Sequence, residues 1–144
     1  FRMSNIQAAV GVEQLQKLKK FCLRKNQINN NYIRGLTFSN QLSVIKNPPW
    51  GISNHWLNIL RMDHKSKIYL NNLKNYLRGR GIETRYLWNP LHKQPAFKHL
   101  QVLENGTAMH AFETSLCLPS STNLSKKQQK YVIEAICEYV LGNI

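Results

Sequence analysis

Apolar residues recur at helical spacing along the first part of the chain. The positions are Ile6, Val10, Leu15, Leu18, Cys22, Ile28, Tyr32 and Ile33. Residues three or four apart share one face of a helix, so this pattern predicts a single helix that is capped by Ser4 or Asn5 and ends near Gly35. The predicted helix is much longer than average, and long helices often bridge domains or subunits.

Four short segments later in the chain have the pattern of β-strands. They are rich in large apolar residues and are bounded by prolines, glycines or polar turn residues. The four segments are residues 42–50, 55–62, 82–88 and 116–119. Residues 89–97 contain Pro90 and Pro95. This stretch is predicted to form a loop, because proline removes a backbone donor and restricts the residue before it.

Three further helices are expected, over residues 66–81, near residues 107–115 and over residues 125–142. The first of them is amphipathic, and Gly79 and Gly81 are expected to terminate it. Its predicted buried side consists of Ile68, Leu70, Leu73, Tyr76 and Leu77. Ser125 is the predicted cap of the last helix. The apolar face of that helix carries Val132, Ile136 and Val140.

Together these elements predict a small α+β domain with a long N-terminal helix and a short, mostly antiparallel sheet that has helices on one side. A length of 144 residues suits one domain, and a composition of 42% hydrophobic and 19% charged residues is typical of a globular chain. No apolar run approaches the roughly 20 residues that a membrane-spanning helix needs. The order of the strands does not follow from the pattern.

The charge balance is strongly basic, with 20 Lys and Arg residues against 7 Asp and Glu residues. Such an excess indicates an anionic partner, which is a nucleic acid, a membrane surface or a phosphorylated ligand. A second interpretation is that the chain is one part of a longer protein whose acidic complement lies elsewhere. The basic residues are spread along the whole sequence, without the dense tract that a nucleic-acid-binding arm shows.

Cysteines and histidines give no sign of a metal site or a disulfide framework. The cysteines are Cys22, Cys117 and Cys137, an odd number without close spacing. They are predicted to be buried free thiols, as expected in a reducing cytoplasm. The histidines lack zinc-type pairing, and the sequence contains no GxSxG or glycine-rich phosphate motif. No catalytic, metal-binding or cofactor-binding residue is therefore assigned.

The segment GIETRYLWNPLHKQPAF is the strongest candidate for a binding site. It places several aromatic and donor side chains at the end of a predicted strand and in a proline-bounded loop: Arg85, Tyr86, Trp88, His92, Lys93 and Gln94. Aromatic rings offer flat surfaces to a base or sugar, and Arg, His and Gln offer donors to phosphates and hydroxyls. A purely structural interpretation remains open, in which Tyr86 and Trp88 alternate along a strand and His92 caps a turn.

Three separated segments carry a family resemblance. In chain order they are RMSNIQAAVGVEQL, GIETRYLWNPLHKQPAF and LCLPSSTNLSKKQQKYVIEAI. Their order and spacing resemble the C-terminal part of the DegT/DnrJ/StrS family of sugar-nucleotide aminotransferases. The resemblance covers nearly the whole chain, although residues 37–53 match nothing in particular.

The resemblance implies that residues 1–144 are the single C-terminal, small domain of a fold-type-I aminotransferase. In that family a larger N-terminal domain binds pyridoxal phosphate (PLP) and supplies the Schiff-base lysine, the acidic partner of the pyridine nitrogen and a stacking aromatic ring. That domain is absent from this chain, so the chain alone is expected to be inactive. The family pattern Asn-x-Arg-Met also implies that the sequence begins just inside an active-site segment.

The resemblance further implies three substrate-binding residues, which are Arg2, His92 and Gln94. Arg2 matches an arginine at the dimeric active site, and His92 and Gln94 match a PLHxQP-like loop near the nucleotide-sugar pocket. The expected reaction transfers an amino group from glutamate to a keto sugar in a cytoplasmic homodimer, for surface glycan or amino-sugar synthesis. Two alternatives stay open: a basic nucleic-acid-binding module, and a non-catalytic regulatory member of the same family.

Overall fold

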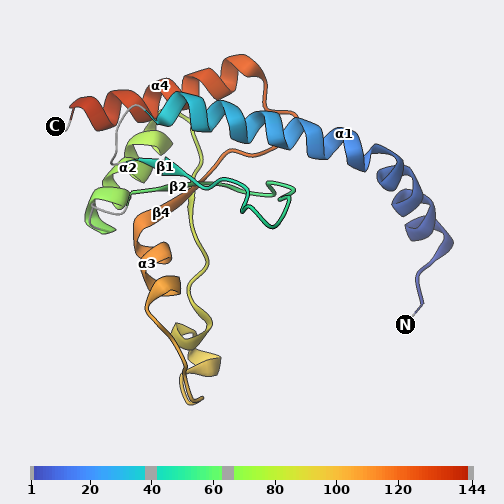
Figure 1. Cartoon of the computed structure of the whole chain (residues 1–144), viewed down its shortest axis with the longest axis horizontal. Helices are drawn as coiled ribbons and strands as arrows, with labels where there is room; N and C mark the ends of the chain where they lie inside the picture. Colours follow the sequence, from blue (N-terminus) through green and yellow to red (C-terminus); the bar gives the residue numbers. More distant parts are fainter. Residues whose placement is uncertain (1, 38–41, 63–66, 143–144) are drawn as a thin grey trace.

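The structure is a computed structural model that describes residues 2–37, 42–62 and 67–142. The helices and strands are α1 (Asn5–Leu36), β1 (Ser43–Val44), β2 (Asn58–Arg61), α2 (Lys67–Gly79), β3 (Arg85–Tyr86), α3 (Thr107–Thr114), β4 (Ser115–Leu118) and α4 (Lys126–Gly142). Two single 3₁₀ turns, η1 (Leu91–Lys93) and η2 (Pro95–Phe97), lie in the described part of the predicted loop. The predicted α+β class is confirmed, and Figure 1 shows the arrangement of these elements.

The strands form one sheet in the order β1-β2-β4-β3, and the pairs seen among the described residues are antiparallel. Leu60 pairs with Leu116 in β2 and β4, and Tyr86 of β3 pairs with Leu116 from the other side. Side chains on alternate strand positions share one face of a sheet. Leu60, Met62, Leu116 and Leu118 are all buried, and they form one core with residues of α1, α2 and α4. The prediction of helices on one side is confirmed.

Strands β1, β2 and β3 are shorter than their predicted segments, because side chains and a helix end take backbone donors that a longer ladder would need. Strand β4 has the predicted length of four residues but begins one residue earlier, at Ser115. In the β1–β2 connection, the Ser53 N–H donates to Asn47 Oδ1 at 2.9 Å, and the His55 N–H donates to Ser53 Oγ at 3.0 Å. Before β3, the Ile82 N–H donates to the Leu77 carbonyl at 2.9 Å and closes the end of α2. Local bonds of this kind compete with sheet pairing.

The long N-terminal helix is confirmed as α1, which has 32 residues. Ser4 is its cap, and Ser4 and Gln7 exchange side-chain and backbone hydrogen bonds in a capping box. The predicted end of the helix near Gly35 is confirmed, since α1 ends at Leu36, and Gly35 itself lies in the last turn. A Cβ atom at position 35 would lie 2.8 Å from Ile133 Cγ2. Gly35 therefore serves the close approach of α1 and α4.

The two halves of α1 have different surroundings. Ile28, Tyr32 and Leu36 in its second half are fully buried. In its first half, Ile6 is 79% exposed and Leu15 is 68% exposed, although both belong to the predicted apolar pattern. Figure 1 shows why: the N-terminal half extends past the sheet and α4, where no described segment covers it.

Helix α2 confirms the predicted amphipathic helix, although residue 66 lies outside the described residues. Leu70, Leu73 and Leu77 are fully buried, and Tyr76 packs at the edge of the core. The assignment of Ile68 to the buried side is wrong, because this side chain is 75% exposed. Two residues along a helix correspond to a rotation of roughly 200°, so Ile68 lies nearly opposite Leu70.

Helix α4 confirms the last predicted helix and its cap. The Gln128 N–H donates to Ser125 Oγ at 3.1 Å, and the Ser125 N–H donates to Gln128 Oε1 at 2.9 Å. The predicted apolar face of α4 is buried at Val132, Ile136 and Val140. Among the described helices, none combines the length and the apolar character that a membrane-spanning segment requires.

Candidate functional site

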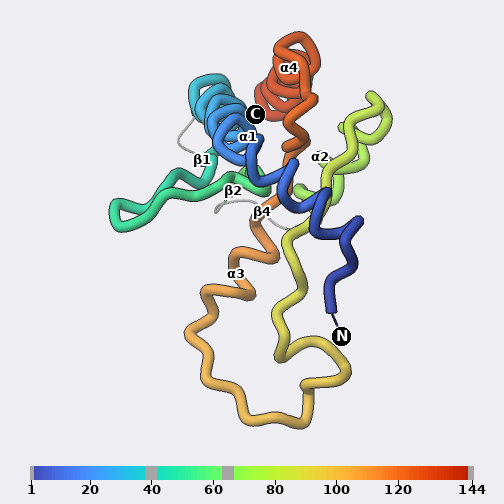
Figure 2. Tube along the Cα trace, turned by 90° about the vertical axis from the view of Figure 1, so that its right-hand side faces the viewer, coloured from blue at the N-terminus to red at the C-terminus, as the bar shows by residue number. Residues whose placement is uncertain are grey.

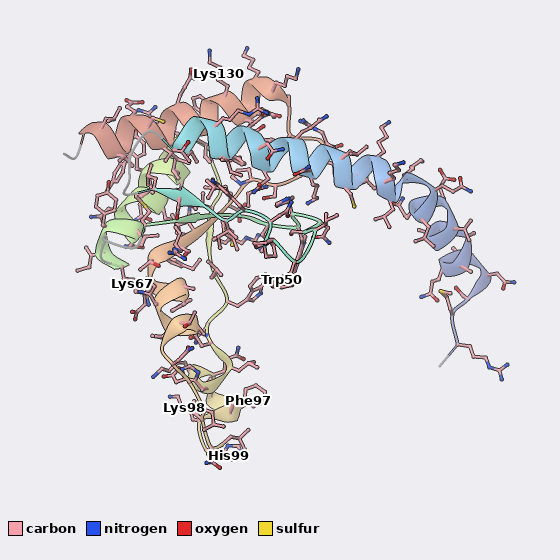
Figure 3. All side chains as sticks on the ribbon, in the orientation of Figure 1. Trp50, Lys67, Phe97, Lys98, His99 and Lys130 are labelled. Atoms are coloured by element: carbon pink, nitrogen blue, oxygen red, sulfur yellow. The ribbon has the colours of Figure 1, made fainter. Side chains whose placement is uncertain are left out.

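The candidate site lies on the loop between β3 and α3, which projects from the body of the domain. Figure 2 shows it as an open excursion beyond the sheet, and Figure 3 labels Phe97, Lys98 and His99 at its far end. The turn η1 forms because the Lys93 N–H donates to the Pro90 carbonyl at 2.9 Å. Pro90, whose carbonyl accepts this bond, is buried.

His92 lies in η1, and its side chain is 16% exposed. Its Nε2 atom lies 3.0 Å from Oε2 of Glu104, which is the distance of an ion pair when the imidazole is protonated. The ring N–H does not point along this line, so the contact is a close approach to a carboxylate and not a hydrogen bond. The structure thus replaces the simple turn-capping role considered for His92 with a contact across the loop.

Gln94 follows η1 and bonds within the same turn. Its side-chain Nε2 atom donates to the backbone carbonyl of Asn89 at 3.1 Å, and the backbone carbonyl of Gln94 accepts from the Phe97 N–H at 3.0 Å. These bonds shape the loop that carries His92. A role of Gln94 in substrate binding stays a prediction.

Tyr86 faces the helices of its own domain. Its hydroxyl donates to Asn71 Oδ1 at 2.9 Å, and Lys74 Nζ lies 4.6 Å from the centre of its ring. Trp88 is 61% exposed, and its ring centre lies 5.5 Å from that of Trp56. The structural interpretation therefore fits Tyr86, whereas Trp88 remains available at the surface.

Arg2 precedes α1 and is exposed, and Phe1 before it lies outside the described residues. Figure 1 shows the N-terminal end of α1 well to one side of the loop that carries His92. Within one chain the structure therefore does not bring Arg2 together with His92 and Gln94.

A cavity of about 720 Å³ opens beside β3, β4 and the start of α4. Its lining includes Lys25, Trp56, Arg85 and Tyr131, and none of the three predicted substrate-binding residues belongs to it. Sequence reasoning missed Lys25 here. A signal for it existed, because Lys25 is three, four and seven residues from the buried Ile28, Asn29 and Tyr32, on the face that α1 turns to the sheet.

Lys25 and Glu83 of this cavity do not form a PLP site. A PLP enzyme needs a lysine for the Schiff base and an acidic or basic partner for the pyridine nitrogen. Lys25 Nζ donates to the carbonyls of Trp56 at 3.2 Å and Ser120 at 2.9 Å, and burial lowers its pKa. Glu83 Oε1 accepts from Arg85 Nη2 at 3.0 Å. Both groups are thus engaged in contacts within the domain.

Two further ionisable groups, the Tyr32 phenol and the Cys117 thiol, are buried within the domain. Tyr32 is fully buried and its hydroxyl donates to the Pro119 carbonyl at 2.9 Å. Burial raises the pKa of the Tyr32 phenol and of the Cys117 thiol. Cys22, Cys117 and Cys137 all lie in the described part of the chain and are free, as predicted. The predicted burial holds for Cys117 alone, because Cys22 and Cys137 are half-buried.

This antiparallel sheet, with helices on one face and a projecting loop, has the fold of part of a known aminotransferase. The crystal structure of the aminotransferase TlmJ from Streptoalloteichus hindustanus matches 96% of this chain with a TM-score of 0.84 and 28% identity. The chain belongs to the DegT/DnrJ/EryC1/StrS aminotransferase family, whose pattern matches residues 1–137. The family predicted from the three sequence segments is confirmed.

Two curated relatives cover the same region. A protein of Bacillus subtilis named as a pyridoxal phosphate-dependent aminotransferase, EpsN, is 31% identical over an alignment of 140 residues. The alignment covers 94% of this chain and 36% of EpsN. GDP-perosamine synthase of Vibrio cholerae is 26% identical over 96% of this chain and 38% of its own length. The chain therefore spans little more than a third of these relatives, as it does of TlmJ, where the share is 37%.

Proposed function

We propose that the intact protein is a PLP-dependent aminotransferase that moves an amino group from glutamate to the keto group of a nucleotide-linked sugar. The observation that carries this proposal is the family match over residues 1–137, which includes the whole candidate loop. A relative named GDP-perosamine synthase supports a nucleotide-linked amino sugar as the product class. Such a product serves surface glycan or amino-sugar synthesis.

The cofactor is held by a larger domain that is not part of this chain. This assignment fits the engagement of Lys25 and Glu83 in contacts within the small domain. When bound, PLP supplies the electron sink for the reaction. This chain supplies binding and orientation of the sugar nucleotide, and it is inactive by itself.

Arg2, His92 and Gln94 are the proposed substrate-binding residues. Arg2 offers a permanent charge and a planar fork that suits a phosphate or a carboxylate. The imidazole of His92 bonds a sugar hydroxyl or phosphate oxygen, and Gln94 fixes the turn beside it through Asn89. A net charge of +13 favours approach of the anionic nucleotide.

A homodimer reconciles these residues with the geometry. The N-terminal end of α1, which follows Arg2, and the loop that carries His92 extend from different sides of one chain (Figure 1). In the proposed dimer, the N-terminal end of α1 from one subunit reaches the pocket that the His92 loop of the other subunit lines. The free thiols of the described residues agree with a reducing cytoplasm.

An isotope-transfer assay on the intact protein tests this function. The protein, PLP and ¹⁵N-glutamate are incubated with a panel of nucleoside diphosphate keto sugars, and products are separated and weighed by mass spectrometry. The expected product is an amino sugar nucleotide that carries the ¹⁵N label. The control is the same protein after borohydride reduction with PLP, which should transfer no label. No label transfer to any keto sugar, together with strongly salt-dependent binding to DNA, would favour the nucleic-acid-binding alternative.

A further inference from the structure

One contact joins the two legs of the projecting loop. His92 lies on the leg that leaves β3, and Glu104 lies on the leg that returns to α3. Their Nε2 and Oε2 atoms are 3.0 Å apart, and the carboxylate side chain is 39% exposed. The segment between them ends in exposed residues such as Leu103, which is 94% exposed. The contact therefore closes a loop whose far end has little packing of its own.

The other hydrogen bonds on the described loop act over short distances in sequence, and the ring contact of Trp88 is with Trp56 outside the loop. Gln94 bonds Asn89 within the η1 turn, and the Thr107 N–H donates to Asn105 Oδ1 at 3.1 Å where α3 begins. Such contacts do not hold one leg of the loop against the other. Closing a flexible loop of this length costs conformational entropy, so a contact between its two legs restricts the position of His92.

The same contact distinguishes the two imidazole nitrogens. When the imidazole is protonated, opposite charges lie 3.0 Å apart at Nε2 and Glu104 Oε2, and their attraction holds the ring against the returning leg of the loop. Nδ1 is the nitrogen that does not face the carboxylate, so it is the one that can meet a substrate group such as a sugar hydroxyl.

We propose that Glu104 is a positioning residue for His92, and that it acts on sugar-nucleotide binding only through the imidazole. This inference rests on the proposed function, because it assumes that His92 meets the substrate. Glu104 touches no substrate itself. Its effect is to hold the ring of His92 against the returning leg of the loop.

A double-mutant cycle in the intact enzyme tests this coupling. Glu104→Ala, His92→Ala and the double variant are compared with the wild type by steady-state kinetics with varied sugar nucleotide. Glu104→Ala should raise KM for the sugar nucleotide about 5- to 20-fold and change kcat by less than about threefold, the pattern of lost binding that does not depend on the chemical step. In the His92→Ala background, Glu104→Ala should change KM by less than about twofold.

The matched control is Glu134→Ala on α4. Glu134 Oε1 lies 3.5 Å from Lys130 Nζ. Figure 3 shows Lys130 on the opposite side of the domain from the loop tip. This variant should keep the wild-type KM. Melting temperatures of all variants are measured on the same preparations, and His92→Gln replaces His92→Ala if the latter does not fold.

Two results would overturn the inference alone, in an active wild-type enzyme. One is an unchanged KM in Glu104→Ala. The other is an equal KM increase from Glu104→Ala with and without His92, which would mean that Glu104 only shapes the loop. A wild-type enzyme that aminates no nucleotide-linked sugar would overturn the proposed function and, with it, this inference.

Discussion

Gly35 of α1 and Ile133 of α4 are in such close contact that a Cβ atom at position 35 would lie 2.8 Å from Ile133 Cγ2 and 2.9 Å from its Cδ1. Real Cβ atoms essentially never approach another carbon this closely. Ile133 is β-branched, so its Cγ2 atom cannot move away without a change of rotamer. The absence of a side chain at Gly35 thus sets the distance between the two helices.

Replacing Gly35 by alanine should destabilise the domain relative to the same replacement at another glycine of α1. Gly11→Ala is the control, because nothing lies within 4 Å of its added Cβ and both glycines are in α1. Alanine in an open helical position gains up to about 1 kcal/mol. Because of the clash at Gly35, the free energy of unfolding in urea should be about 1–3 kcal/mol lower for Gly35→Ala than for Gly11→Ala. Equal stability of the two variants would contradict this packing.

Gly35 also shows where prediction from sequence stops. Glycine near the end of an apolar pattern is a common helix stop, so the pattern alone favoured that role. The actual role depends on Ile133, almost 100 positions away in the sequence. The error at Ile68 has a different cause, which is local: two residues along a helix correspond to a rotation of roughly 200°, so Ile68 and Leu70 cannot share the buried side. The helices followed from periodicity, whereas the ends of the strands depended on local bonds such as that of the Ile82 N–H to the end of α2, which the apolar pattern does not show.

The candidate site was predictable only in part. The residue types of the segment made His92 and Gln94 two of six candidates, and only the family resemblance singled them out as substrate-binding residues, which stays a prediction. The segment gave no sign of Glu104, since the contact with His92 arises from the return of the loop to α3. Tyr86 was a candidate for ligand binding, and only its bond to Asn71 revealed that it faces α2.

The buried hydroxyl of Tyr32 predicts a pH dependence of stability. Burial raises the pKa of Tyr32 above its ordinary value of 10.0. Above pH 10 the unfolded chain therefore loses this proton while the folded chain keeps it, so the free energy of unfolding falls by up to about 1.4 kcal/mol per pH unit. Below pH 10 the contribution is fully present.

The measurement compares wild type with Tyr32→Phe by urea unfolding between pH 7 and pH 11.5, so that effects of other groups cancel in the difference. Near neutral pH the variant should be less stable by about 0.5–1.5 kcal/mol, because the bond to the Pro119 carbonyl is lost. Above pH 10 the difference in free energy of unfolding between wild type and Tyr32→Phe should shrink to zero and then change sign. A gap that stays constant over this range would mean that the Tyr32 phenol titrates alike in both states.

The cysteines should react slowly in the native chain. The thiolate is the reactive form, and burial raises the pKa of the Cys117 and Cys137 thiols. Titration with a thiol reagent should modify Cys117 last, because it is 8% exposed, and should reach three thiols per chain after unfolding. Cys117→Ser should remove the slowest phase. A titre of one thiol in the unfolded, unreduced chain would instead reveal a disulfide.

The 144-residue chain should form no specific aldimine with PLP. Lys25 is the residue to watch, because burial lowers its pKa and a neutral amine is the reactive form. Its Nζ atom is nevertheless bound to two backbone carbonyls. After incubation with PLP and borohydride, peptide mapping should find scattered labelling of exposed lysines, and Lys25→Met should leave the total nearly unchanged. A stoichiometric adduct on one lysine would refute the assignment of the cofactor to another domain.

Arg2 and His92 should affect catalysis by the intact enzyme without affecting cofactor binding. Arg2→Ala and His92→Ala are each expected to keep the PLP absorbance and to lower kcat/KM for the sugar nucleotide by one to three orders of magnitude, which is about 1.4 to 4 kcal/mol. Arg2→Lys should restore only part, because an ammonium group cannot make the bidentate contact of a guanidinium. Lys98→Ala, at the loop tip in Figure 3, is the matched control for loss of a cation.

The competing interpretation is that both side chains only stabilise the domain, Arg2 at the start of α1 and His92 through Glu104. It predicts lower melting temperatures with normal kinetics of the remaining folded enzyme. The exposure of Arg2 argues against a large stabilising role, because an exposed charge contributes about 0–1 kcal/mol. Melting temperature and kinetics measured on the same preparations separate the two interpretations. Normal kcat/KM in both variants would remove Arg2 and His92 from the site, and Gln94 would then be left only with its bond to Asn89.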